Sequence, residues 1–343
     1  MSTVLFPDDY FGGPPLCETK NNEAEKIWLI EEIIKPELPN IMDNMEKCLE
    51  LLLSDVSFKM PISGGGGTSK SNSGISSIRG VVTRQNCVVT DFHAIVKFPQ
   101  YNWGKPIMFK MDTSRKYVLE QIRDITKNLK EALLVLEDLQ QEEDPQEFIK
   151  KIATVLNLLS RSINVLENPP RQLLFPENGN DTLETLFTHT NDAPWETAHH
   201  FLNLELVIFK NEVSIEVRNL KKETALPWSR IDATTGKSFT DTVRERLKEH
   251  REKSLAEVLK AAGLRVEERS FLQSVFPNSK SGRTTMEEAQ YMLSRSVTFH
   301  GHLVSESDKV SATTSDPTLI SITSKLNGLE SCLSNHFTNL GLI

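Results

Sequence analysis

The sequence has few cysteines, and they are scattered along the chain. Its 343 residues include four, Cys17, Cys48, Cys87 and Cys332, with no C-x-x-C spacing. This pattern argues against a structural zinc site and against the disulfide framework of a small secreted domain. We therefore predict reduced thiols that behave as small buried hydrophobic side chains.

Long apolar runs and an excess of positive charge are also missing. No run approaches the roughly 18 residues needed to span a bilayer, and the first ten residues lack the basic and apolar parts of a secretory signal. We expect a cytoplasmic protein with no direct membrane insertion. The 39 Lys and Arg residues against 47 Asp and Glu residues give a net charge of −8, which predicts no nucleic-acid partner.

The chain has instead a sustained helical periodicity. Apolar residues recur every three or four positions in four stretches, residues 27–52, 118–139, 148–166 and 319–340. This spacing places the apolar side chains of each stretch along one face of a helix. The sequence therefore predicts four long amphipathic helices.

Helix boundaries are marked as well. Asp144-Pro145 and Asp316-Pro317 each combine a side-chain oxygen that can cap a first turn with a proline whose missing N–H costs nothing there. Only residues 142–144 separate the second and third helices, so these two should form an antiparallel hairpin. Pro36 and Pro39 predict a kink near the middle of the first helix.

Between the helices the apolar period changes to two, which predicts strands. The predicted strands are residues 78–84, 87–98, 106–111, 202–208, 213–217 and 297–303. The fourth and fifth flank a tight turn at Lys210-Asn211 and form the clearest hairpin in the chain.

The apolar faces of the four helices must be buried, because isolated helices are marginal in water. An intramolecular four-helix bundle and an intermolecular coiled coil both satisfy this requirement. Comparable helix lengths, the short hairpin and the two prolines favour the bundle. We predict an elongated two-domain α+β protein, with an antiparallel four-helix bundle and an antiparallel β domain.

The domain boundaries follow from these elements. The predicted helical bundle domain comprises residues 20–57, 112–168 and 316–343. The predicted β domain comprises residues 78–111 and 169–304, including a charged helical insertion at about 240–264. The glycine- and serine-rich residues 58–77 and the polar residues 305–315 are predicted to be flexible linkers.

One stretch resembles the end of a phosphate-binding P-loop. It contains Gly236-Lys237-Ser238, but Ile231 stands where the motif needs its first glycine, and no buried strand leads into it. A polar turn that caps the following charged helix is the favoured interpretation. A nucleotide-binding switch or an enzyme that uses this turn is kept as an alternative.

A second candidate is a pair of histidines. His300 and His302 are two residues apart on a predicted strand, so both would point to one face and could share a metal ion. A solvated strand face is favoured because no cysteine or carboxylate at ligand spacing accompanies them. With no recognisable catalytic motif in the chain, we predict no catalytic, cofactor-binding or metal-binding residues, and no enzyme.

The order of elements resembles the Rogdi family more than any single motif does. A helix and a gap are followed by Arg79-Gly80-Val81-Val82-Thr83, a strand ending in Phe98-Pro99, the helix-opening residues 117–124, and Leu174-Phe175-Pro176 before the hairpin. The likeness spans most of the chain. Residues 220–285 look expanded relative to shorter animal members.

The resemblance implies a small subunit of the RAVE complex, which promotes assembly of the peripheral and membrane sectors of the vacuolar proton-pumping ATPase. It implies a helical bundle with a leucine-zipper-like seam and no cofactor. The implied partners are a large propeller-containing RAVE subunit, peripheral ATPase subunits and a small ubiquitin-ligase adaptor. Peripheral recruitment to endosomal and vacuolar membranes is implied too. Besides this assembly role and the nucleotide-switch or enzyme alternative, a self-associating coiled-coil structural protein is the third hypothesis.

For the partner-binding surface, we look first to the charged helix and the exposed strand edges.

Overall fold

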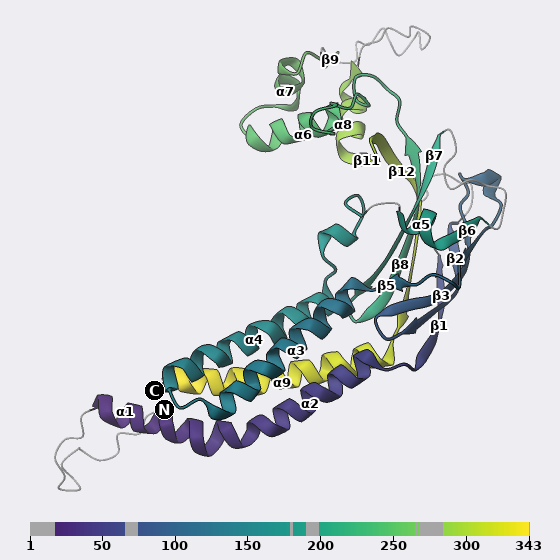
Figure 1. Ribbon diagram of the computed structural model, residues 1–343. Coiled ribbons are helices and arrows are strands. Elements are labelled where there is room, and N and C mark those ends of the chain that lie inside the picture. Colours follow the sequence, from purple (N-terminus) through teal and green to yellow (C-terminus); the bar gives the residue numbers. More distant parts are fainter. Residues whose placement is uncertain are drawn as a thin grey trace, which may run out of the picture.

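The computed structural model describes residues 18–65, 75–178, 181–189, 199–264, 266–267 and 284–342. Long helices lie at one end of the molecule, two β-sheets lie in the middle, and a small helical group lies at the other end (Figure 1). Both large sheets are antiparallel, which confirms the predicted α+β class.

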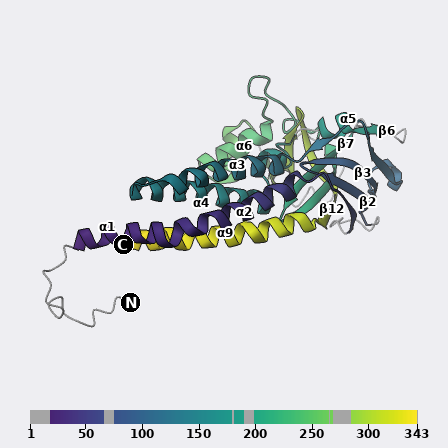
Figure 2. The same ribbon diagram turned by 60° about the horizontal axis from the view of Figure 1, so that its bottom comes forward.

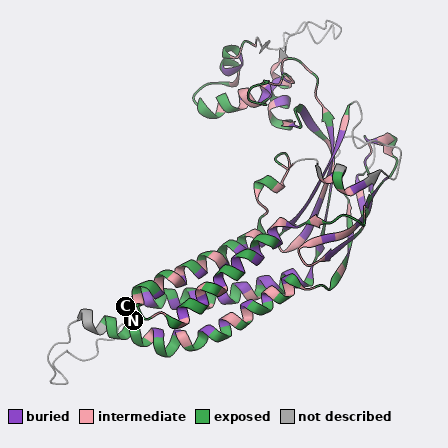
Figure 3. Cartoon of the chain, in the orientation of Figure 1, coloured by how far each residue is buried: buried purple, intermediate pink, exposed green. Residues whose placement is uncertain are grey.

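The four predicted helices are present. They are α2 (Lys35–Leu53), α3 (Glu120–Gln141), α4 (Pro145–Glu167) and α9 (Pro317–Leu342). Helix α2 lies against α3 and α9, and α4 lies against the same two helices (Figures 1 and 2). Their buried faces point toward one another, and their exposed faces point outward (Figure 3).

The apolar stripes predicted from the sequence are buried in these helices. In α3 they are Ile122, Ile125, Leu129, Ala132, Leu136 and Leu139, all fully buried. The predicted caps form: Asp144 accepts the backbone N–H of Gln146 at 3.0 Å, and Asp316 accepts that of Thr318 at 2.9 Å. The periodicity misplaced one start, because Val118 belongs to the short strand β5 (Tyr117–Val118) and not to α3.

The first helical run is irregular before its prolines. Helix α1 (Glu18–Trp28) continues into a π-helical segment (Leu29–Ile34) and then into α2. The backbone N–H of Lys35 reaches the carbonyl of Ile30, five residues back. Pro36 follows in the first turn of α2, and Pro39 lies inside the helix. Short π-helical segments are rare and occur often beside functional sites.

The first sheet has the strand order β1-β2-β3-β4-β6, and β5 pairs with β3. Its strands are β1 (Ser57–Gly65), β2 (Ser77–Gln85), β3 (Val88–Lys97), β4 (Ile107–Met111) and β6 (Phe187–His189). The second sheet has the order β11-β12-β8-β7. Its strands are β7 (His200–Phe209), β8 (Glu212–Lys222), β11 (Ser296–Phe299) and β12 (His302–Ser315).

The predicted turn at Lys210-Asn211 is confirmed. Both residues have positive φ, 50° and 63°, as a two-residue hairpin turn with a right-handed strand twist requires. Strands β7 and β8 pair in register from His200 with Lys221 to Phe209 with Glu212.

Both segments predicted as flexible linkers contain strands, so these predictions were wrong. Residues 57–65 form β1 and residues 302–315 form β12, while residues 66–74 lie outside the described part of the chain. Gly64 is a packing residue: a Cβ there would lie 2.0 Å from the carbonyl oxygen of Ser311 in β12. The glycine allows the two sheets to approach closely where β1 meets β12.

The single charged helix predicted at 240–264 is two helices, α6 (Phe239–Glu249) and α7 (Leu255–Ala261). Ser254 and Glu257 form a capping box that begins a new helix, which explains the break. With α8 (Met286–Arg295) they enclose a small core around the fully buried Trp228.

The remaining short elements are two 3-10 turns (Asn102–Gly104 and Arg171–Leu173), α5 (Asp181–Leu186) and the parallel pair β9 (Val266–Glu267) and β10 (Thr284–Thr285). One hydrophobic core runs from the four helices into both sheets without interruption. The core around Trp228 is separate from it. Among the described residues, the helical and β parts therefore share their interior.

Candidate functional site

The outer face of the first sheet is exposed and carries an excess of basic side chains. Alternate residues of four strands point away from the core, and we call this surface the basic face. It comprises Lys59 and Pro61 of β1, Arg79 and Val81 of β2, His93, Ile95 and Lys97 of β3, and Met108 and Lys110 of β4. The strand register brings them side by side, with Arg79 opposite Ile95 and Ile95 opposite Met108.

The basic face has an apolar centre. Ile95 is 51% exposed, Met108 41% and Val81 38%. Four Lys or Arg side chains surround these residues in a chain whose net charge is −8. Asp91 of β3 lies two residues before His93 on the same face, but the Lys and Arg side chains outnumber it. Exposed apolar residues with mainly basic surroundings are typical of a protein-binding surface, and here the excess of positive charge favours an acidic partner.

A tryptophan stands out in the connection between β3 and β4. Trp103 is 96% exposed and has φ = 59°, a left-handed conformation that is uncommon for a bulky residue. Exposed tryptophans are enriched among the residues that dominate binding energy at interfaces. The loop beside β3 and β4 therefore offers a second contact for a partner.

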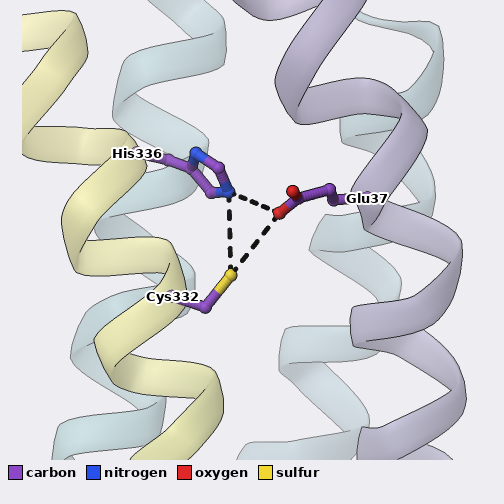
Figure 4. Close-up of side chains that lie close together, drawn as sticks. All are labelled: Glu37, Cys332 and His336. Atoms are coloured by element: carbon purple, nitrogen blue, oxygen red, sulfur yellow. Dashed lines mark hydrogen bonds and ion pairs between the residues drawn. The ribbon is translucent and has the colours of Figure 1, made fainter.

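A different kind of cluster joins the two ends of the chain. Glu37 in the first turn of α2 meets Cys332 and His336, which are four residues apart on α9 (Figure 4). His336 Nε2 lies 2.8 Å from Glu37 Oε2, and Cys332 Sγ lies 3.6 Å from each of these two atoms. Within the described part of the chain, these are the His, Cys, Asp and Glu side chains that converge closely enough to share a metal ion.

The cluster is half open to solvent. The His336 side chain is 11% exposed and that of Glu37 is 50% exposed. Burial, followed by the charge of Glu37 and the hydrogen bond to it, raises the pKa of the Cys332 thiol. No sequence pattern predicts this cluster, because Glu37 lies almost 300 residues from Cys332 and His336. The local signal is the C-x-x-x-H spacing of Cys332 and His336 on the apolar stripe of one helix.

The stretch that resembles a P-loop is a helix start. Ser238 caps α6 and forms a capping box with Asp241, and Gly236 has a φ of 67°. Lys237 Nζ lies 2.6 Å from Glu245 Oε1. These contacts confirm the favoured interpretation of a polar turn that caps the following helix.

The histidine pair does not lie on one strand, so that expectation was wrong. His300 has a φ of 47° and lies with Gly301 in a tight turn, and His302 begins β12 on the far side of that turn. Gly301 adopts φ = 70° readily, so the alternation of residues 297–303 ends at a hairpin.

The family model described as "Rogdi leucine zipper containing protein" matches residues 25–341, which is nearly the whole chain and includes all four long helices and both large sheets. The chain belongs to this family. The expectation drawn from the order of elements is thereby confirmed.

A similar protein comes from Saccharomyces cerevisiae. The yeast "Regulator of V-ATPase in vacuolar membrane protein 2" is 43% identical over 342 residues, which cover 99% of this chain and 97% of the yeast protein. Among the described residues, no helix is long and apolar enough to cross a membrane.

Proposed function

We propose that this member of the Rogdi family is a non-catalytic regulator of the V-ATPase and acts within a RAVE complex. The observation that carries the proposal is the 43% identity to the yeast V-ATPase regulator along essentially the full length of both proteins. From that identity and coverage we infer that the two proteins share one fold and the same partner-binding surfaces.

The proposed activity is assembly, by protein–protein interaction, of the peripheral sector of the ATPase onto its membrane sector. The proposed partners are a large propeller-containing RAVE subunit, peripheral ATPase subunits and a small ubiquitin-ligase adaptor. The chain works in the cytoplasm and is recruited peripherally to vacuolar and endosomal membranes. The four long helices form a bundle, and the β part, which shares its core with them, presents the partner-binding surface.

The basic face supports a binding role for the β domain. Its apolar centre at Ile95, Met108 and Val81 is surrounded by Lys59, Arg79, Lys97 and Lys110. A partner that carries carboxylates around an apolar contact would bury the centre and pair with the rim. Rim charges of this kind mainly raise the association rate, whereas the apolar centre sets the lifetime of the complex.

The experiment is a pull-down with the purified full chain as bait and purified RAVE and peripheral ATPase subunits as prey. We expect the wild-type chain to retain at least one of these subunits. Ile95→Glu should weaken retention, because it puts an acidic group at the centre of a surface that selects acidic partners. Leu134→Glu is the matched control, since Leu134 is 63% exposed on α3 and is not part of the sheet.

If the wild-type chain retains no RAVE or ATPase subunit, the proposed function is wrong. If both variants bind like the wild type, the function stands and the basic face is not the contact.

A further inference from the structure

The cluster of Glu37, Cys332 and His336 has the donor atoms of a metal site. It offers one nitrogen, one sulfur and one oxygen, each aimed at the other two (Figure 4). Cysteine, histidine and carboxylate together form a donor set that suits Zn²⁺. Cys332 and His336 are separated by one helical turn, a spacing that lets two side chains of one helix share an ion.

The distances between the donor atoms fit a tetrahedral ion. Zinc bonds are about 2.0–2.1 Å long to nitrogen, about 2.0–2.2 Å to oxygen and about 2.3 Å to sulfur. In a tetrahedral site, these lengths place the sulfur about 3.6 Å from the nitrogen and from the oxygen, and the nitrogen about 3.4 Å from the oxygen. The observed separations are 3.6 Å for both pairs that involve Cys332 Sγ. Only the pair between His336 and Glu37, at 2.8 Å, must open by about half an ångström.

The charges and the exposure fit as well. A thiolate, a carboxylate and a neutral imidazole carry two negative charges, which a divalent cation neutralises. Glu37 is half exposed, so it can shift to open the nitrogen–oxygen distance, and water can reach the fourth coordination position. Glu37 lies in the first turn of α2, directly after the π-helical segment that ends at Ile34, and such segments often occur beside functional sites.

We propose that Glu37, Cys332 and His336 bind a zinc ion that links α2 to α9. These two helices come from opposite ends of the sequence and lie side by side. Binding displaces the thiol proton, and any proton on the imidazole, to solvent. Bonds from the ion to water are exchanged for one Zn–S, one Zn–N and one Zn–O bond, with no change of oxidation state. The ion is a structural link between the first and last long helices, independent of which partners the protein binds.

The test uses the purified full chain, stripped with a chelator and titrated with Co²⁺ and then with Zn²⁺. We expect one cobalt ion per chain, with a sulfur-to-cobalt charge-transfer band and the visible bands of a tetrahedral site, both displaced by zinc. Zinc should also raise the thermal transition temperature of the chain.

Variants distinguish this site from a simple ion pair. Cys332→Ser should abolish the charge-transfer band. It should also lower the zinc affinity by more than about 100-fold, because loss of a residue that only hydrogen-bonds to a ligand already lowers metal affinity by about 10- to 100-fold. Glu37→Gln keeps a hydrogen bond to His336 but removes a charged ligand, so it too should weaken zinc binding. Cys87→Ser is the matched control, because Cys87 is half-buried in the turn between β2 and β3 and is not a member of the cluster.

The proposal is overturned if cobalt gives no thiolate band with the wild-type chain, or if the band survives in Cys332→Ser. It is also overturned if zinc leaves the thermal transition of the wild type unchanged. Because these readouts need no partner, their failure leaves the V-ATPase proposal untouched.

Discussion

Arg84 and Asp316 form a buried ion pair that joins β2 to the start of α9. Arg84 Nε lies 2.5 Å from Asp316 Oδ2, and the two side chains are 1% and 0% exposed. Arg84 Nη1 donates to the carbonyl of Asn86 at 2.6 Å, and the other carboxylate oxygen of Asp316 caps α9 at Thr318. Arg84 Nη2 has no hydrogen-bond partner in the part of the chain that the structure describes.

Loss of one partner leaves the other charge buried and uncompensated. Such single deletions destabilise proteins by about 3–5 kcal/mol. Asp316→Asn keeps a cap for α9, so we expect a loss of about 3 kcal/mol in the free energy of unfolding. Asp316→Ala also removes the cap, which adds about 1 kcal/mol.

The assay is urea unfolding followed by helical circular dichroism, arranged as a double-mutant cycle. Arg84→Met with Asp316→Asn removes both charges, so the double variant should be more stable than the sum of the single losses predicts, by about 2–3 kcal/mol. Lys47→Met is the control: Lys47 pairs with Asp43 on the surface of α2, and its loss should not move the urea midpoint. A loss below about 1 kcal/mol for Asp316→Asn, or strict additivity, would show that the two buried charges do not compensate each other.

Four further predictions concern two glycines, a buried thiol, nucleotide binding and the basic face. Gly64→Ala should destabilise the chain by about 2 kcal/mol or more because its Cβ would meet the carbonyl of Ser311, whereas Gly328→Ala in α9, with open space around it, should stabilise by about 0.5–1 kcal/mol; urea midpoints that move together would contradict this. Burial raises the pKa of the Cys48 thiol from 9.0 to about 11, so the folded chain keeps that proton longer than the unfolded chain does. Stability should therefore be complete below pH 9 and fall as the pH rises toward 11, with a shallower slope in Cys48→Ala. Millimolar ATP or GTP should not raise the thermal transition temperature; a rise that Lys237→Ala abolishes would restore the nucleotide-switch hypothesis. Ile95→Glu should reduce subunit capture in the pull-down without changing the thermal transition.

Local patterns predicted the local structure well. The three-and-four spacing identified the four long helices because their stripes are buried without a break, as in α3 and α9. The caps at Asp144 and Asp316 and the turn at Lys210-Asn211 depend on residues next to each other in the chain, and all three formed.

The errors arose where contacts between distant segments decide the structure. Gly64 reads as part of a flexible run, but its missing side chain lets β1 approach β12. The polar residues of β12 read as a linker, yet β8 supplies their backbone partners from Glu212 to Lys222. The cluster at Glu37 brings together side chains that no sequence window contains, so only the packing of α2 against α9 reveals it.

Replacement of the yeast regulator by this chain tests V-ATPase assembly most directly. The measurement is the amount of peripheral ATPase sector on purified vacuolar membranes, together with their ATP-driven proton transport, in yeast that lacks its own regulator. We predict that this chain restores both, and that Ile95→Glu restores less than Leu134→Glu does. Expression of the folded chain with no recovery of the peripheral sector on the membrane would contradict the proposed function.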